Sequence, residues 1–284
     1  MGTSARRLLI AAIHHGEWPS APGAQVLAAA RSAFQETGWQ VATIEVVEQP
    51  PLESPWAAGE LGEHRRRQRT LERRWRAHLQ QSSTGADLQA GLAQAVESIA
   101  LRLSAEYRQR TDRARQIQAL VTEKHCRAFA QAQTASVDWL LVLESDATLR
   151  PESPQGLADL AQSLPSGGAW FVDLAGGIDA LEGQHVVRRI PETNLVRLDP
   201  PVTNTACAYL ISRDMVTYLV EYRHANPGAD EWAIDWFVNA AFMAAQDRGA
   251  AIDCARHQPR LLDHGSFTGM TTSWRSTDLN DADE

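Results

Sequence analysis

The segment Val137-Asp-Trp-Leu-Leu-Val-Leu-Glu-Ser-Asp-Ala-Thr-Leu-Arg-Pro151 decides how this chain folds. Its uninterrupted apolar run is typical of a strand that is buried on both faces, as in the parallel sheets of α/β proteins. The run ends in two acids, Glu144 and Asp146, with one serine between them. Ligands of open α/β sheets bind outside the carboxyl ends of the strands. Two carboxylates at such an end suit a hard divalent cation that carries a phosphorylated ligand.

The segments around this strand predict an α/β fold. Residues 7–13 read as a strand, 24–34 as an amphipathic helix and 39–47 as a second strand, which is a βαβ opening and implies parallel pairing. Downstream of the acids we expect further segments, listed here in chain order: helix 154–163, strands 169–174, 185–190, 194–198 and 206–212, helix 213–222, and a last helix that begins near Asp230. The prediction is a Rossmann-like mixed, mostly parallel sheet.

Residues 56 to 136 are helical in character, with a break at Ser82-Ser-Thr-Gly85. The first part holds seven arginines within twelve residues: Arg65, Arg66, Arg67, Arg69, Arg73, Arg74 and Arg76. They could grip phosphate or an anionic acceptor, or they could form a solvated helix face. The second part carries apolar residues at helical spacing: Leu88, Leu92, Val96, Ile99 and Leu103. That face needs an apolar partner, either within the chain or in a homodimer; alternatively, the stretch folds over the acceptor site as a cationic lid.

Composition excludes some classes of function. A net charge of −8 over 284 residues argues against a general nucleic-acid binder, which needs a broad basic surface. No apolar run reaches the roughly 18 residues that a membrane span requires. The three cysteines, Cys126, Cys207 and Cys254, are far apart and read as reduced core thiols of a cytoplasmic protein.

Several short motifs follow one another in a recognisable order. His125 lies 19 residues before Glu144, and the later segments are Thr205-Ala-Cys-Ala-Tyr-Leu-Ile-Ser-Arg213, Ile234-Asp-Trp236, Pro259 and His264-Gly-Ser266. Over residues 120–275 this order resembles glycosyltransferase family 25, the lipooligosaccharide-type transferases with a GT-A fold. Two residues depart from the family pattern: Ser145 replaces its middle acid, and Lys124, the only lysine, replaces a serine before His125.

The resemblance implies a GT-A-like single domain over residues 1–275, with 56–118 as an arginine-rich helical insertion. Residues 276–284 are predicted to form an acidic, disordered tail. The implied function is metal-dependent transfer of a sugar from a nucleotide-sugar donor to a carbohydrate or small-molecule hydroxyl acceptor.

The resemblance also implies roles for individual residues. Asp146, supported by Glu144 and with His264 as a third ligand, is expected to hold Mn²⁺ or Mg²⁺ at the donor diphosphate. Asp235 is the expected carboxylate base of an inverting reaction, and Glu231 is the second candidate. The two acids are four residues apart, and the predicted helix near Asp230 would place them on one face.

The remaining candidates are expected to contact the substrates. Trp232 and Trp236 could offer an aromatic platform for a sugar ring. The other residues assigned to substrate are Lys124, His125, Asn204, Thr205 and Ser266. We assign His14 and Ser145 to the nucleotide, since both lie at strand ends.

Two other classes of function stay open. A sugar-phosphate nucleotidyltransferase also pairs carboxylates with a metal, but it should show a glycine-rich loop after the first strand, and His14-His-Gly-Glu-Trp-Pro19 has one glycine. A sugar-binding or scaffold protein derived from a transferase would use the arginine-rich helices as its working surface. The retained acid pair argues against the scaffold.

Overall fold

The structure is a computed structural model that describes residues 5–14, 16, 18, 20–47, 56–78, 95–176, 186–204 and 206–265. Several sequence predictions fall outside these residues: those for Thr205 and Ser266, the break at 82–85, the apolar positions Leu88 and Leu92, and the tail 276–284. Among the described residues, no helix is both long enough and apolar enough to cross a lipid bilayer.

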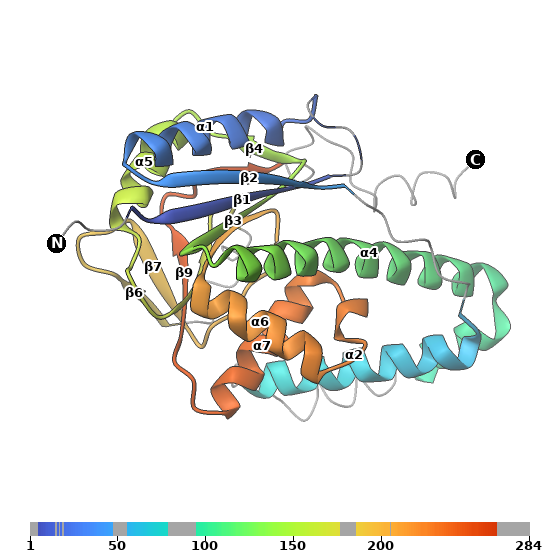
Figure 1. The fold of residues 1–284 in the computed structure, drawn as a ribbon. Helices are drawn as coiled ribbons and strands as arrows, with labels where there is room; N and C mark the ends of the chain where they lie inside the picture. The colour runs from blue at the N-terminus through green and yellow to red at the C-terminus, as the bar shows by residue number, and fades with distance from the viewer. Residues whose placement is uncertain are drawn as a thin grey trace.

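The predicted α/β fold is confirmed (Figure 1). The strands are β1 (Arg7–Ile13), β2 (Gln40–Val46), β3 (Trp139–Glu144), β4 (Ala147–Leu149), β5 (Ala169–Asp173), β6 (Val186–Arg189), β7 (Leu195–Asp199), β8 (Ala208–Ser212), β9 (Ile252–His257) and β10 (Leu262–His264). The described part of the chain forms one eight-stranded sheet in the order β2-β1-β3-β8-β5-β9-β7-β6, together with a separate pair, β10-β4. Six of the eight strands run in one direction, and β8 and β7 run against them.

The βαβ opening is present as the sequence predicts. Helix α1 (Gly23–Glu36) connects β1 to β2, which pair in parallel with Leu8 opposite Val41. β3 pairs in parallel with the other side of β1, and its first five residues are buried. The acidic strand therefore lies inside the sheet, and its carboxyl end shares one edge with the ends of β1 and β2.

Helices cover both faces of the sheet (Figure 1). α1 and α5 (Ser153–Ser163) pack on one face, where alternate strand residues such as Ile10 and Leu141 meet Phe34. α4 (Ala105–Ala135), α6 (Arg213–Ala225) and α7 (Ile234–Asp247) pack on the other face, around Phe129 and Phe237. The period-two alternation of the strands thus supplies two separate cores.

The helical character of residues 56–136 is confirmed where the chain is described. α2 (Ala58–His78) and α4 run beside each other (Figure 1), and residues 95–103 are also helical. The predicted insertion boundary at residue 118 falls within the continuous helix α4. Val96, Ile99 and Leu103 are 67, 57 and 81 % exposed, so described residues of this chain do not cover that apolar face.

The prediction of one helix from about Asp230 is wrong. Residues Ala229–Glu231 form a short 3-10 turn, η2, and α7 begins only at Ile234. Trp232 has extended backbone angles and interrupts the helical path between the two elements. Glu231 and Asp235 therefore do not share a helix face, and neither do Trp232 and Trp236.

Candidate metal centre

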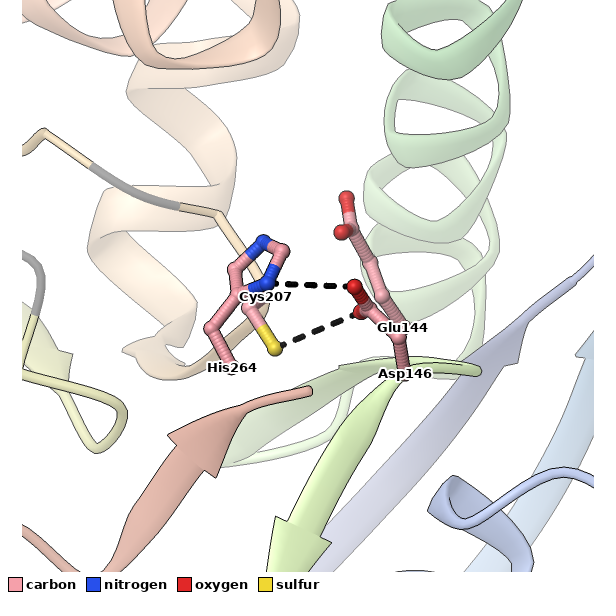
Figure 2. A group of neighbouring side chains, drawn as sticks. All are labelled: Glu144, Asp146, Cys207 and His264. Carbon is pink, nitrogen blue, oxygen red and sulfur yellow. Dashed lines mark hydrogen bonds and ion pairs between the residues drawn. The ribbon is translucent and has the colours of Figure 1, made fainter. Parts of the chain in front are cut away.

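Four side chains that can ligate a metal meet at the carboxyl end of β3. One atom each of Glu144, Asp146, Cys207 and His264 lies within 4.8 Å of every other (Figure 2). The predicted ligands Glu144, Asp146 and His264 are thus brought together, although 118 residues separate the last two in sequence. Among the described residues, the group holds neither Asp235 nor Glu231.

Strand pairing explains how Cys207 and His264 reach the acids. β8 runs antiparallel to β3, and the Glu144 N–H donates to the Cys207 carbonyl at 2.8 Å, so Cys207 lies opposite the strand end. β10 pairs antiparallel with β4, which places His264 opposite Ala147. The Gly265 N–H then donates to the Asp146 carbonyl at 2.8 Å. The turn between β3 and β4 is therefore held by neighbours on two sides.

Helix α1 begins against the same turn. The Gly23 N–H donates to the Ser145 carbonyl at 2.9 Å. A Cβ atom at Gly23 would lie 2.7 Å from the Glu144 carbonyl oxygen and 3.1 Å from that of Ser145. Glycine is required here because the backbone of α1 approaches the strand end too closely for a side chain.

Asp146 makes the direct contacts within the group. Its Oδ2 lies 3.1 Å from His264 Nδ1, and its Oδ1 accepts from the Cys207 thiol at 3.6 Å. Burial and the charge of Glu144 raise the pKa of Asp146, while His264 opposes the increase. An added cation would relieve the repulsion between the two carboxylates.

Cys207 is a member of the group that sequence analysis treated only as a core thiol. Burial, followed by the charges of Asp146 and Glu144, raises the pKa of this thiol well above its ordinary value. The thiol therefore keeps its proton beside the acids. Its position immediately before a strand that pairs with the acidic strand was the signal available in the sequence.

Asp173 is a further carboxylate that sequence analysis missed. It ends β5, is buried, and accepts from the N–H groups of Ala175 and Gly176 at 2.9 and 3.3 Å. Its charge also contributes to the raised pKa of Cys207. The apolar strand ending in an acid before Gly176-Gly177 resembles the pattern at Glu144 and could have been noticed.

The predicted pair Lys124 and His125 lies on α4, where the two side chains reach the carboxyl ends of β1 and β3. Lys124 is fully buried, and its Nζ donates to the His14 carbonyl at 2.6 Å, which ties α4 to the end of β1. His125 contacts Glu144, with its Nε2 3.0 Å from Oε1. His14 is buried, its ring stacks on Trp18, and its Nε2 lies 3.5 Å from Glu45.

The other predicted substrate residues lie in different places. Asn204 is exposed and follows Thr203, whose N–H and carbonyl are both bonded to the Asn239 side chain at 2.8 Å. Trp236 packs edge-on against Trp75, with ring centroids 5.3 Å apart. The Trp232 carbonyl accepts from the Thr122 hydroxyl at 2.6 Å.

Glu231 and Trp232 line a separate hollow of about 1140 Å³ between α2 and the segment from α6 to η2. The Glu231 carboxylate lies 3.6 Å from His64 Nδ1. Arg66 and Arg67 on the α2 wall both pair with Glu63. Glu63, on the same helix, thus offsets part of the positive charge of the arginine-rich helix.

Comparison with known proteins gives no family. No family model matches the chain, and no curated protein matches it. Among solved structures, the chain is similar to a glycosyltransferase involved in the glycosylation of the major capsid of PBCV-1. The two share 11 % identity with a TM-score of 0.40, over 96 % of this chain and 98 % of that chain. A likeness this distant shows neither a family nor an activity.

Proposed function

We propose that this protein is a metal-dependent glycosyltransferase that moves a sugar from a nucleotide-sugar donor to a hydroxyl acceptor. The observation that carries the proposal is the meeting of Glu144, Asp146 and His264 at the carboxyl end of β3, in a sheet whose strands mostly run in one direction. Phosphorylated ligands of such sheets bind at this edge. The sequence resemblance to glycosyltransferase family 25 supports the same reaction.

The residues present fit a divalent cation. Two carboxylates and an imidazole form an oxygen-rich set with one nitrogen, which suits Mn²⁺ better than Mg²⁺. Burial, and then the negative charge of Glu144, raise the pKa of Asp146, and a bound cation would oppose both effects. A bound cation would supply charge neutralisation for the diphosphate that leaves as the glycosidic bond breaks.

Asp235 remains our first candidate for the base of an inverting transfer. It lies in the first turn of α7, where the helix dipole favours an ionised carboxylate. Glu231 is the second candidate, and it lines the hollow between α2 and η2. We expect Asp235→Asn to lower turnover by about 100-fold or more with little change in donor affinity. A loss confined to affinity would move the base elsewhere.

The proposal further places the reaction in the cytoplasm and the donor nucleotide near His14 and Ser145. The two alternatives, a nucleotidyltransferase and a scaffold derived from a transferase, make different predictions. The first would release pyrophosphate from a nucleoside triphosphate and a sugar phosphate. The second would bind a glycan without needing a metal.

Metal and donor binding can be measured together. The protein is titrated with Mn²⁺ by electron paramagnetic resonance, and its thermal stability is then recorded with UDP-, GDP-, CMP- and dTDP-sugars, each with and without Mn²⁺. We expect one nucleotide class to raise Tm only when the metal is present. Asp146→Ala should abolish that increase, and Asp214→Ala, at an exposed acid of α6, should retain it. No response to any donor, or a response that is independent of metal, would overturn the proposal.

A further inference from the structure

A chain of three side chains runs from the candidate metal centre into the core. His125 Nε2 lies 3.0 Å from Glu144 Oε1, and His125 Nδ1 lies 2.6 Å from the Tyr209 hydroxyl. His125 and Tyr209 are both fully buried, whereas the Glu144 side chain is 22 % exposed. Glu144, at one end of this hydrogen-bonded series, therefore faces the candidate metal centre, and Tyr209, at the other end, is buried in the core.

The protons of this chain can be placed by donor and acceptor capacity. An ionised Glu144 only accepts, so the facing Nε2 carries a hydrogen. In a neutral imidazole the other nitrogen then accepts, so the Tyr209 hydroxyl donates to Nδ1. Burial, with the charge of Glu144, raises the pKa of Tyr209 well above its ordinary value, which agrees with a hydroxyl that keeps its proton. Tyr209 therefore donates to His125, and His125 donates to the Glu144 carboxylate.

Packing fixes the rings that make these bonds. The His125 and Tyr209 rings are nearly parallel, with an interplanar angle of 11° and centroids 5.8 Å apart, and Tyr209 stacks on Phe171 with centroids 5.0 Å apart. The residues come from three elements, since His125 is on α4, Tyr209 on β8 and Phe171 on β5. Lys124, next to His125, anchors α4 to β1 through the His14 carbonyl. The imidazole has little freedom to turn away from Glu144.

We propose that His125 and Tyr209 are positioning residues that hold the Glu144 carboxylate in place for the metal. His125 contacts one oxygen of the Glu144 carboxylate, so Glu144 would offer a cation a carboxylate whose rotamer is already set. Partners of this kind orient ligands and change metal affinity by about 10–100-fold when removed. The inference rests on the proposed function, because it concerns the metal centre of that function.

The test is the affinity for Mn²⁺ alone, measured by electron paramagnetic resonance on the metal-free full-length protein. Tyr209→Phe removes only the hydroxyl that donates to His125, and we expect the Mn²⁺ Kd to rise about tenfold. Tyr222→Phe, at a buried tyrosine of α6, is the matched control and should leave the Kd unchanged. Near-ultraviolet circular dichroism verifies that each variant is folded.

A second pair of variants keeps the inference testable if Tyr209→Phe is poorly folded. His125→Leu removes the bond to Glu144, whereas His125→Gln keeps an N–H donor of similar reach. We expect the glutamine variant to recover part of the affinity that the leucine variant loses. If the wild-type protein binds no Mn²⁺, the proposed function itself is wrong. Wild-type protein that binds Mn²⁺, with variants whose affinity matches it, would overturn this inference alone.

Discussion

At the scale of the residue, Asp146 is well placed to bind a metal, but its ionised form lowers the stability of the metal-free protein. It is the carboxylate in direct contact with His264 and Cys207, and its pKa is raised by burial and by Glu144. A raised pKa means that the ionised form weakens the fold: stability is full below the unfolded-state pKa and falls as the pH rises through the folded-state pKa. The ionised carboxylate of Asp146, the candidate metal ligand, therefore lowers the stability of the metal-free protein at neutral pH.

Asp146→Asn tests whether the ionised carboxylate lowers the stability of the metal-free protein. At neutral pH and without metal, we expect the variant to have a higher Tm than the wild type, since the amide cannot ionise. The difference should vanish in acid, where the wild-type carboxylate is itself protonated. Mn²⁺ should raise the Tm of the wild type and leave that of the variant unchanged. A metal-free variant that is less stable than wild type at neutral pH would contradict the argument.

Cys207 makes a second prediction at this scale. Its protonated thiol donates to Asp146 and is a poor ligand for Mn²⁺, but soft metals select thiolates. Cys207→Ser keeps a donor to Asp146, so Mn²⁺ affinity should stay the same, whereas Cd²⁺ affinity should fall by about tenfold or more. The wild-type Cd²⁺ complex should show a sulfur-to-metal charge-transfer band that the variant lacks. A large loss of Mn²⁺ affinity in the variant would make Cys207 a ligand of the working metal.

At the scale of the element, the start of α1 fixes the turn that carries the acids. Gly23→Ala places a Cβ 2.7 Å from a backbone carbonyl, which cannot swing aside as a side chain can. We expect a loss of about 1–3 kcal/mol in the free energy of unfolding, by analogy with overpacked cores, and weaker Mn²⁺ binding as the turn shifts. Denaturant unfolding and the metal titration measure the two effects.

Gly62→Ala is the matched control, since nothing lies within 4 Å of the added Cβ on α2. It should raise stability by about 0.5–1 kcal/mol through helix propensity alone and leave the metal unaffected. Equal behaviour of the two variants would show that the approach of α1 to the turn has no effect.

Near Asp230 the local sequence pattern predicts the wrong start for a helix. The sequence predicts one helix from about Asp230 that carries Glu231 and Asp235, yet η2 ends at Glu231, Trp232 is extended and α7 begins at Ile234. The bond from Thr122 on α4 to the Trp232 carbonyl holds the interrupted conformation. A contact with a residue 110 positions away is invisible to local periodicity.

At the scale of the whole molecule, the helical arm, meaning residues 56–78 and 95–118 of the predicted insertion, holds a network of ion pairs. The buried Glu97 carboxylate pairs with Arg65 and Arg69 of α2, and these arginines lower its pKa despite its burial. A lowered pKa contributes stability that is present above the ordinary pKa and is lost as the pH falls through the folded-state pKa. The sequence predicts that this arm is an insertion in the catalytic domain.

Glu97→Ala tests that prediction. Removing one partner of a mostly buried ion pair should cost about 3 kcal/mol and should increase hydrogen exchange in α2 and residues 95–103. The Mn²⁺ affinity should not change if the arm is an accessory to the sheet. Glu106→Gln, at an exposed acid of the same arm, is the control and should change neither measurement. A parallel loss of metal affinity would make the arm part of the catalytic unit.

The sequence by itself determined the α/β class, the βαβ opening, the acidic strand end and three of the four side chains in the metal group. These follow from short-range patterns, because apolar periodicity and the residues that end a strand are local properties of a chain. Only the tertiary structure decided that His264 contacts Asp146, that Cys207 joins the group and that Glu231 lies in a separate hollow. These contacts depend on which strands pair, and pairing between segments distant in sequence is set by the packing of the whole core. The sequence alone identifies Glu144 and Asp146, whereas the group of side chains around them forms only when the strands pair in the folded protein.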